Sequence, residues 1–378
     1  MNAFLRKILL FVPLLLSIAV FNWNVDPACL FVPGYEERIV SLLLQGKNII
    51  GPMNHNDRRQ QVLFAEAMGT PRDVYVFGSS RTMGFTSSLF SPQSFYNAWV
   101  SGAVLRDYVG IYNTFRRRDR LPKTLVLGLD PWLFNRNNPQ NTRRYPALET
   151  DYHLILDKWG MNDEEDNQTG SINLVPSPIA LFCEKYSELL SPAYLQQSIT
   201  FLRTNRTSTQ SASALSPGNS KCEKRCREAL PNEEPFRYAD GSWLYPRAMN
   251  NRSEEASLVD VANATKLNLS LENYTAFDPW LVEEFERLVS QMIEDKVQVI
   301  FYLPPLHPIL YNKVSNSPEY HKKTIEAEQY FRNYAQKNGI SVHGSYNPQA
   351  CRMGSADFVD GWHLRNEAFG KAFQPADL

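Results

Sequence analysis

The stretch DVYVFGSSRTMGF spans residues 73–85. Its first part, Val74–Phe77, is a short apolar run of β-branched and aromatic residues without polar alternation. Such a run is typical of a strand that is buried on both faces. It stops at Gly78, and two serines and an arginine follow directly. The stretch therefore predicts a buried strand that ends in a polar turn, which raises the question of what that turn is for.

Similar apolar runs alternate with amphipathic helical patterns along the rest of the chain. Strand alternating with helix is typical of a parallel sheet covered by helices on both faces. The sequence therefore predicts an α/β fold, a flavodoxin-like three-layer α/β/α arrangement. Further strands are expected within 94–103, 124–130, 297–305 and 340–344, and helices within 35–47, 57–68, 103–118, 279–296 and 319–339.

The candidate polar groups all follow predicted strands. Ser79 and Ser80 follow the first strand, Gly102 the second and Asp130 the third. Ligands of parallel sheets bind beyond the carboxyl ends of the strands. We therefore expect these residues to meet at one edge of the sheet.

The chain divides into an N-terminal segment, a lead-in and a main domain. Residues 1–24 form the first, 25–70 a helical lead-in, and 71–378 the α/β domain. Within that domain, a long insertion at about 136–276 follows the third strand and contains stretches rich in Ser, Thr and Asn, which are typical of loops.

The N-terminal segment is predicted to direct export. Arg6 and Lys7 precede the uncharged, apolar run Ile8–Trp23. This pattern fits a single-pass membrane anchor or a cleaved signal peptide, with a buried core helix as the alternative. In both export cases the basic flank stays in the cytoplasm, which places the rest of the chain outside it. No lipobox precedes Cys29, so a lipoprotein is not expected.

Composition narrows the function classes. Hydrophobic residues make up 43% and charged residues 21%, as in a globular protein, and the net charge is −1. Basic residues are scattered, which argues against a nucleic-acid partner. Cys222 and Cys226 lie four residues apart, and an exported compartment would allow them to form a disulfide. No second Cys or His pair lies nearby, so we expect neither a metal site nor a cofactor.

A nucleophilic serine needs a base, and the base needs an orienting group. The chain has six histidines, and only His363 has an acid at short spacing beside a predicted helix start, in Asp360–His363 (DGWH). Gly361 permits the turn that would bring Asp360 back to the imidazole. Two structural alternatives stand beside this interpretation: Asp360 caps a helix that begins at His363, and the serines cap a helix after the first strand.

Together, these stretches resemble the SGNH/GDSL hydrolase superfamily in four short blocks. FGSSR (77–81) is similar to the first block, with Ser80 at the nucleophile position and Ser79 in place of its usual Asp. NAWVSGA (97–103) resembles the second, whose glycine amide helps to bind the oxyanion, here Gly102. DGWH resembles the last block and implies Asp360 and His363 as the other members of a Ser-His-Asp triad.

The third block departs from the superfamily pattern. Its usual Gly-x-Asn-Asp contains an Asn that donates to the oxyanion, whereas this chain has GLDPWLFN at 128–135. Asp130 stands where a donor is expected, and an ionised carboxylate cannot donate. Either Asn135 or Asn97 replaces the donor, or the oxyanion hole is weaker.

The Gly-Ser-Ser variant behind an N-terminal anchor is similar to a membrane-anchored branch of this superfamily. Its members accompany membrane-bound O-acyltransferases in decorating cell-surface polymers, as alginate acetylation and teichoic-acid D-alanylation proteins do. The resemblance implies an exported serine-dependent O-acyltransferase or acylesterase that acts on a polysaccharide, with a membrane-bound O-acyltransferase as partner. A non-catalytic glycan-binding or scaffold protein and an exported esterase for small lipidic esters remain as alternatives.

Other residues are expected to line the site. Arg81 would bind an anionic group or form a salt bridge, and His307 lies at a strand end on the same rim. Trp243, Tyr245 and Trp280 of the long middle section are consistent with glycan binding if exposed, and core packing is the alternative for them.

Overall fold

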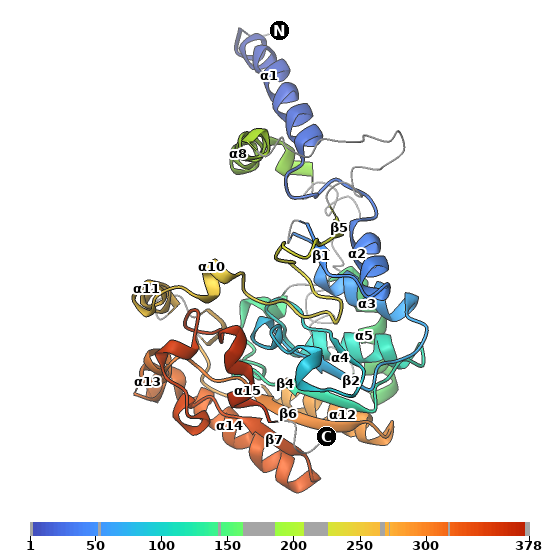
Figure 1. Ribbon diagram of the computed structural model, residues 1–378, viewed down its shortest axis with the longest axis vertical. Coiled ribbons are helices and arrows are strands. Elements are labelled where there is room, and N and C mark those ends of the chain that lie inside the picture. Colours follow the sequence, from blue (N-terminus) through green and yellow to red (C-terminus); the bar gives the residue numbers. More distant parts are fainter. Residues whose placement is uncertain are drawn as a thin grey trace.

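The computed structural model shows an α/β domain from which one helix extends (Figure 1). The structure describes residues 3–51, 54–142, 145–161, 186–207, 226–264, 269–271, 273–316 and 318–374. Cys222 lies outside these ranges, and so does most of the Ser/Thr-rich stretch at 206–220. The predicted Cys222–Cys226 disulfide therefore stays a prediction.

A five-stranded parallel sheet forms the centre of the domain, in the order β3-β2-β4-β6-β7. Numbered along the sheet-forming strands alone, this is 2-1-3-4-5, the flavodoxin-like order. All five strands of this sheet were predicted, and the expected range 94–103 extends six residues past the end of β3 at Asn97. They span Val74–Phe77 (β2), Phe95–Asn97 (β3), Thr124–Gly128 (β4), Gln298–Leu303 (β6) and Ser341–Gly344 (β7).

The two faces of the sheet are covered differently. Alternate strand residues such as Tyr75, Leu127 and Phe301 join one large core with the long helices, whereas Val76 and Ile300 face a smaller one. The smaller core is closed by segments around 83–95 and 351–373 that contain only short helices. This is consistent with three layers, and the second helical layer is thin. The long helices are α4 (Leu105–Arg116), α12 (Pro279–Glu294) and α14 (Pro318–Asn338); the short ones are η2 (Ser87–Leu89), η6 (Pro348–Cys351), η7 (Ser355–Asp357), η8 (Asn366–Ala368) and α15 (Phe369–Ala372).

The lead-in and the inserted segment pair with each other. The lead-in holds α2 (Tyr35–Leu44) and α3 (Asp57–Ala67), as predicted, and also the short strand β1 (Ile49–Ile50). β1 forms an antiparallel ribbon with β5 (Arg227–Glu228) of the insertion. Sequence patterns missed this ribbon because two-residue strands carry no periodicity. Other elements between β4 and α12 are η3 (Pro139–Thr142), α5 (Pro146–Trp159), η4 (Glu188–Leu190), α8 (Pro192–Thr207), α10 (Arg247–Asn250), α11 (Glu254–Ala264) and η5 (Leu269–Leu271), and α13 (Pro308–Ser315) follows β6.

The N-terminal segment forms helix α1 (Ala3–Val25), which points away from the domain, with α8 beside its base (Figure 1). Asn22 Nδ2 donates to the Leu189 carbonyl at 2.9 Å, and the Trp23 and Tyr186 rings stack at 6.0 Å. The insertion therefore packs against the end of α1. Among the residues described well enough to be assessed, no helix combines the length and the apolar character needed to cross a membrane.

Candidate active site

The turn after β2 is held by close packing around one threonine. A Cβ on Gly78 would lie 2.6 Å from Thr82 Cγ2, and a Cβ on Gly128 would lie 2.2 Å from the same atom. Only glycine at both strand ends leaves room for Thr82, whose Oγ1 donates to the Ser79 carbonyl at 2.9 Å. The sequence analysis noted that the strands β2 and β4 each end at a glycine. The structure shows that both glycines make room for the same side chain, Thr82.

This packing places Ser80 against His363. Ser80 begins the short helix η1 (Ser80–Thr82), and its Oγ lies 2.9 Å from His363 Nε2. Ser79 is 2% exposed, and its hydroxyl instead accepts a hydrogen bond from the Arg81 amide at 3.2 Å. Ser80 therefore faces the histidine and Ser79 does not, as predicted.

Asp360 orients the imidazole from the other side. Its Oδ2 lies 2.8 Å from His363 Nδ1, and its Oδ1 accepts from the amides of Trp362 at 2.7 Å and His363 at 2.9 Å. With the Nδ1 proton donated to Asp360, Nε2 is the acceptor for the Ser80 hydroxyl. No helix begins at His363, so the helix-capping alternative for Asp360 is wrong.

The charge of Asp360 is stabilised locally. Burial would raise the pKa of this carboxyl, but the charge of His363 and hydrogen bonds from His363 and two backbone amides outweigh it and lower the pKa. The carboxylate thus stays ionised near neutral pH, as an orienting group for a histidine base must.

Arg81 and Asp130 form a buried ion pair next to the triad. Arg81 Nη1 donates to Asp130 Oδ1 at 2.9 Å, and the two side chains are 2% and 0% exposed. Arg81 also donates to the carbonyls of Pro304, Pro305 and Trp362, at 2.6, 2.8 and 3.2 Å. One guanidinium therefore joins the ends of β2, β4 and β6 to the segment that carries His363.

The expectation that Arg81 and Asp130 line the site is corrected by this burial. The salt-bridge alternative for Arg81 is the right one. Burial raises the pKa of Asp130, and the Arg81 charge opposes that rise. The residue that departs from the superfamily pattern therefore serves as a counter-ion for Arg81 and holds the strand ends.

The backbone amides of Ser80 and Gly102 are the predicted oxyanion donors. Val100 N donates to the Gly78 carbonyl at 3.0 Å, so the chain leading to Gly102 runs beside the chain leading to Ser80. Gly102 has a φ of +58°, which favours glycine. Within the described part of the chain, no acceptor is recorded for the amide of Ser80 or of Gly102.

The two asparagine candidates are held elsewhere. Asn97 is fully buried, and its Nδ2 donates to the carbonyls of Thr82, Met83 and Phe85. Asn135 Nδ2 donates to the Ser270 carbonyl at 2.8 Å. The structure therefore gives no support to either side chain as an oxyanion donor, and Asn97 instead holds the loop that follows Ser80.

His307 lies behind the triad rather than on an open rim. It is 1% exposed, its Nδ1 accepts from the Ile309 amide at 3.2 Å, and its own amide donates to the Gly361 carbonyl at 3.2 Å. Burial lowers the pKa of its imidazole. His307 caps α13 and supports the turn that contains Asp360 and His363.

The aromatic side chains considered for glycan binding are less exposed than open stacking of a sugar requires. Trp243 and Tyr245 are 8% and 7% exposed, and Trp280 packs against the large core. The core-packing alternative is correct for Trp243 and Trp280. Tyr245 differs, because its ring centroid lies 6.2 Å from that of His363.

Among the described residues, no group of three or more His, Cys, Asp or Glu side chains is placed to hold a metal ion.

Comparison with known protein families finds no family that matches the chain, and none of the curated proteins matches it.

Proposed function

We propose that the protein transfers or hydrolyses acyl groups on a cell-surface or secreted polysaccharide through Ser80, His363 and Asp360, as the resemblance to SGNH hydrolases implies. The observation that supports this most is the continuous chain of contacts: Ser80 Oγ to His363 Nε2 at 2.9 Å and His363 Nδ1 to Asp360 Oδ2 at 2.8 Å. A serine, a histidine and a carboxylate in this order are the components of nucleophilic acyl transfer.

In the first step, Ser80 Oγ attacks the carbonyl carbon of the acyl ester while His363 Nε2 takes the hydroxyl proton. The carbonyl oxygen gains the negative charge, and the amides of Ser80 and Gly102 donate to it. The ester C–O bond then breaks, the leaving alcohol takes the proton from His363, and the acyl group remains on Ser80.

In the second step, a sugar hydroxyl or water attacks the acyl-enzyme. His363 removes its proton and returns it to Ser80 Oγ as the bond to the acyl group breaks. Asp360 keeps the Nδ1 proton in place throughout, so the same nitrogen, Nε2, serves both steps.

We also propose that the domain works outside the cytoplasm, attached through α1, beside a membrane-bound O-acyltransferase. The apolar run of α1 behind Arg6 and Lys7 supports this part. Leu14, Leu16 and Val20 on α1 are 56%, 60% and 59% exposed, which leaves apolar surface that water would not favour.

A fluorophosphonate probe tests the chemistry. The wild-type protein and Ser79→Ala are expected to be labelled on one serine, and Ser80→Ala is expected not to react. Unlabelled wild-type protein that hydrolyses an acetylated glycan faster than a nitrophenyl ester supports the polysaccharide substrate; the opposite order favours the esterase for small esters.

A non-catalytic glycan-binding or scaffold protein is the second candidate function. It is favoured by the missing third oxyanion donor, because the side chains of Asp130, Asn97 and Asn135 are all bound elsewhere. A wild-type protein that folds but fails to react with the fluorophosphonate would establish that reading over ours.

A further inference from the structure

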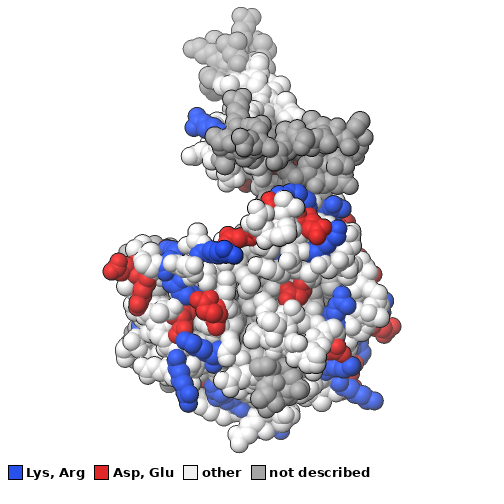
Figure 2. All heavy atoms as spheres, in the orientation of Figure 1, with Lys and Arg blue, Asp and Glu red and all other residues white. Residues whose placement is uncertain are grey.

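A groove of about 750 Å³ opens beside the active site, between the β1–β5 ribbon and the inserted segment around 244–247. Its walls come from the lead-in at Asn48, from β5 and the residues after it, and from Asn366 near the triad. Residues far apart in sequence therefore build one surface. Acidic and basic side chains are interspersed on this shoulder of the domain, below α1 (Figure 2).

Tyr245 connects the groove to the triad, since it lines the groove and its ring lies 6.2 Å from the His363 ring. Its backbone is fixed by Asn366, whose Oδ1 accepts from the Tyr245 amide and whose Nδ2 donates to the Tyr245 carbonyl, both at 2.9 Å.

The phenol of Tyr245 is available to a ligand. The side chain is 7% exposed, and among the described residues no hydrogen-bond partner is recorded for its Oη. Burial and the nearby Asp360 charge raise the pKa of this phenol, so it remains neutral and can both donate and accept. A buried hydroxyl that lines a groove without a protein partner is suited to a ligand hydroxyl.

The charges on the walls indicate which ligand. Three carboxylates, Glu228, Glu233 and Glu234, line the groove with one cation, Arg247. Hydrogen bonds from Arg227 lower the pKa of Glu233 to about 2, so that it stays ionised. Lys47 lies 2.9 Å from Glu228 and Arg227 lies 2.6 Å from Glu233, both from outside the lining. Arg247 lies 3.8 Å from Glu234 and is 91% exposed, so the lining carries more negative than positive charge, which disfavours a polyanion.

We propose that this groove binds an uncharged, hydroxyl-rich glycan segment whose acceptor hydroxyl lies next to Tyr245, and that it excludes polyanionic chains. Carboxylates accept from sugar hydroxyls, and Tyr238 adds an aromatic ring to the lining beside the Tyr245 phenol. This inference rests on the proposed acyl transfer for the role of the ligand: the acyl group passes from Ser80 to a hydroxyl of the bound segment, and His363 takes the hydroxyl proton.

Calorimetric titration of the full chain with hexasaccharides tests the groove directly. The probes are β-linked hexamers of glucose, mannose, galactose and N-acetylglucosamine, together with a uronic acid hexamer. We expect at least one neutral hexamer to bind, with an affinity roughly tenfold lower in Tyr238→Ala, the scale of one lost aromatic contact. The uronic acid hexamer is expected to bind more weakly than that neutral hexamer.

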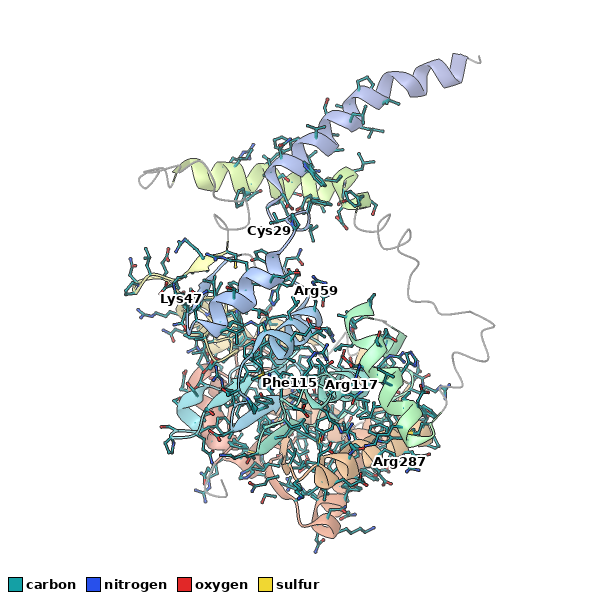
Figure 3. All side chains as sticks on the ribbon, turned by 90° about the vertical axis from the view of Figure 1, so that its right-hand side faces the viewer. Cys29, Lys47, Arg59, Phe115, Arg117 and Arg287 are labelled. Carbon is teal, nitrogen blue, oxygen red and sulfur yellow. The ribbon has the colours of Figure 1, made fainter. Side chains whose placement is uncertain are left out.

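A second groove of about 740 Å³ provides a matched control, because it is lined by Glu283, Glu286 and Arg287 of α12. In Figure 3, Lys47 beside the first groove and Arg287 lie at opposite ends of the domain. Glu234→Gln in the first groove should weaken neutral hexamer binding, and Glu283→Gln should leave it unchanged. Both carboxylates are about half exposed, so neither change should disturb folding.

Three results would overturn the inference: no neutral hexamer binds, binding is unchanged in both Tyr238→Ala and Glu234→Gln, or the uronic acid hexamer binds most tightly. Fluorophosphonate labelling of Ser80 in the same variants separates the two proposals. Labelling that persists while the groove fails overturns only the groove, and a groove that binds without any labelling overturns only the acyl transfer.

Discussion

Ser80 and Arg81 are neighbours in sequence, yet they belong to two different halves of the strand-end region. Ser80 joins an open half with His363 and Asp360, whose side chains are each 21% exposed. Arg81 joins a closed half with Asp130, where exposure is 2% and 0%. The difference teaches that adjacent polar residues can have separate tasks: the open half is available for chemistry, and the closed half holds the strands that carry it.

Ser80→Ala is expected to have the largest effect, and only on activity. In the proposed mechanism Ser80 is the nucleophile, so without its hydroxyl the acyl-enzyme cannot form and the rate should fall roughly 10⁴- to 10⁶-fold. Stability should change by less than about 0.5 kcal/mol, because the hydroxyl is partly exposed. Ester hydrolysis and urea unfolding measure the two quantities. Full activity in Ser80→Ala would contradict the assignment of Ser80 to the open half. A loss of activity in Ser79→Ala without a loss of stability would contradict it as well.

Asp130→Ala should have the opposite profile. It leaves the Arg81 guanidinium buried without a counter-charge, which typically costs about 3–5 kcal/mol. Urea unfolding of the full chain measures the loss. The double variant Arg81→Met, Asp130→Leu sharpens the comparison, since replacing both charges by apolar side chains should restore much of the stability. Equal stability of Asp130→Ala and the wild type would mean that the closed half does not hold the fold.

Asn97→Ala tests the loop that joins the two halves. It removes the donor shared by the carbonyls of Thr82, Met83 and Phe85 in a fully buried position. Leaving buried acceptors unsatisfied should cost about 1–3 kcal/mol. Asn137→Ala is the control, because its hydrogen bond to Asn273 is exposed. A loss in the control as large as in Asn97→Ala would remove the special role of Asn97.

His307→Asn should show the smallest effect, visible only in the pH dependence of stability. Burial lowers the folded-state pKa of His307, so below about pH 6.5 the unfolded chain binds a proton that the folded chain resists. Wild-type stability should therefore fall as the pH drops from about 7 to 5. Asn retains a helix cap but does not titrate, so the variant should be less sensitive over this window.

Urea unfolding at several pH values measures that slope. His153→Asn serves as the control, because it makes the same exchange at a side chain that is 40% exposed. Equal slopes in the wild type and His307→Asn would mean that burial of His307 does not cause the loss of stability at low pH.

The features that sequence reasoning predicted correctly depend on local patterns. The apolar run of β2 and the glycine after it mark a buried strand and its end, and the spacing from Asp360 to His363 marks a turn that returns the carboxylate to the ring. Its errors concern burial. Asn97, Asn135 and His307 are polar residues near strand ends or turns, and nothing in their local sequence tells whether their side chains face the site or the core.

What the sequence by itself determined is the parallel sheet, the residue types at its carboxyl edge and the pairing of Asp360 with His363. These follow from periodicity and short-range geometry, which act over a few residues. Only the tertiary structure decided that Ser80 meets His363 across 283 residues, that Asp130 neutralises Arg81, and that Tyr245 lines a groove beside the triad. Those choices depend on which side chains lose contact with water when distant segments pack, since a buried charge or amide must find its partner there.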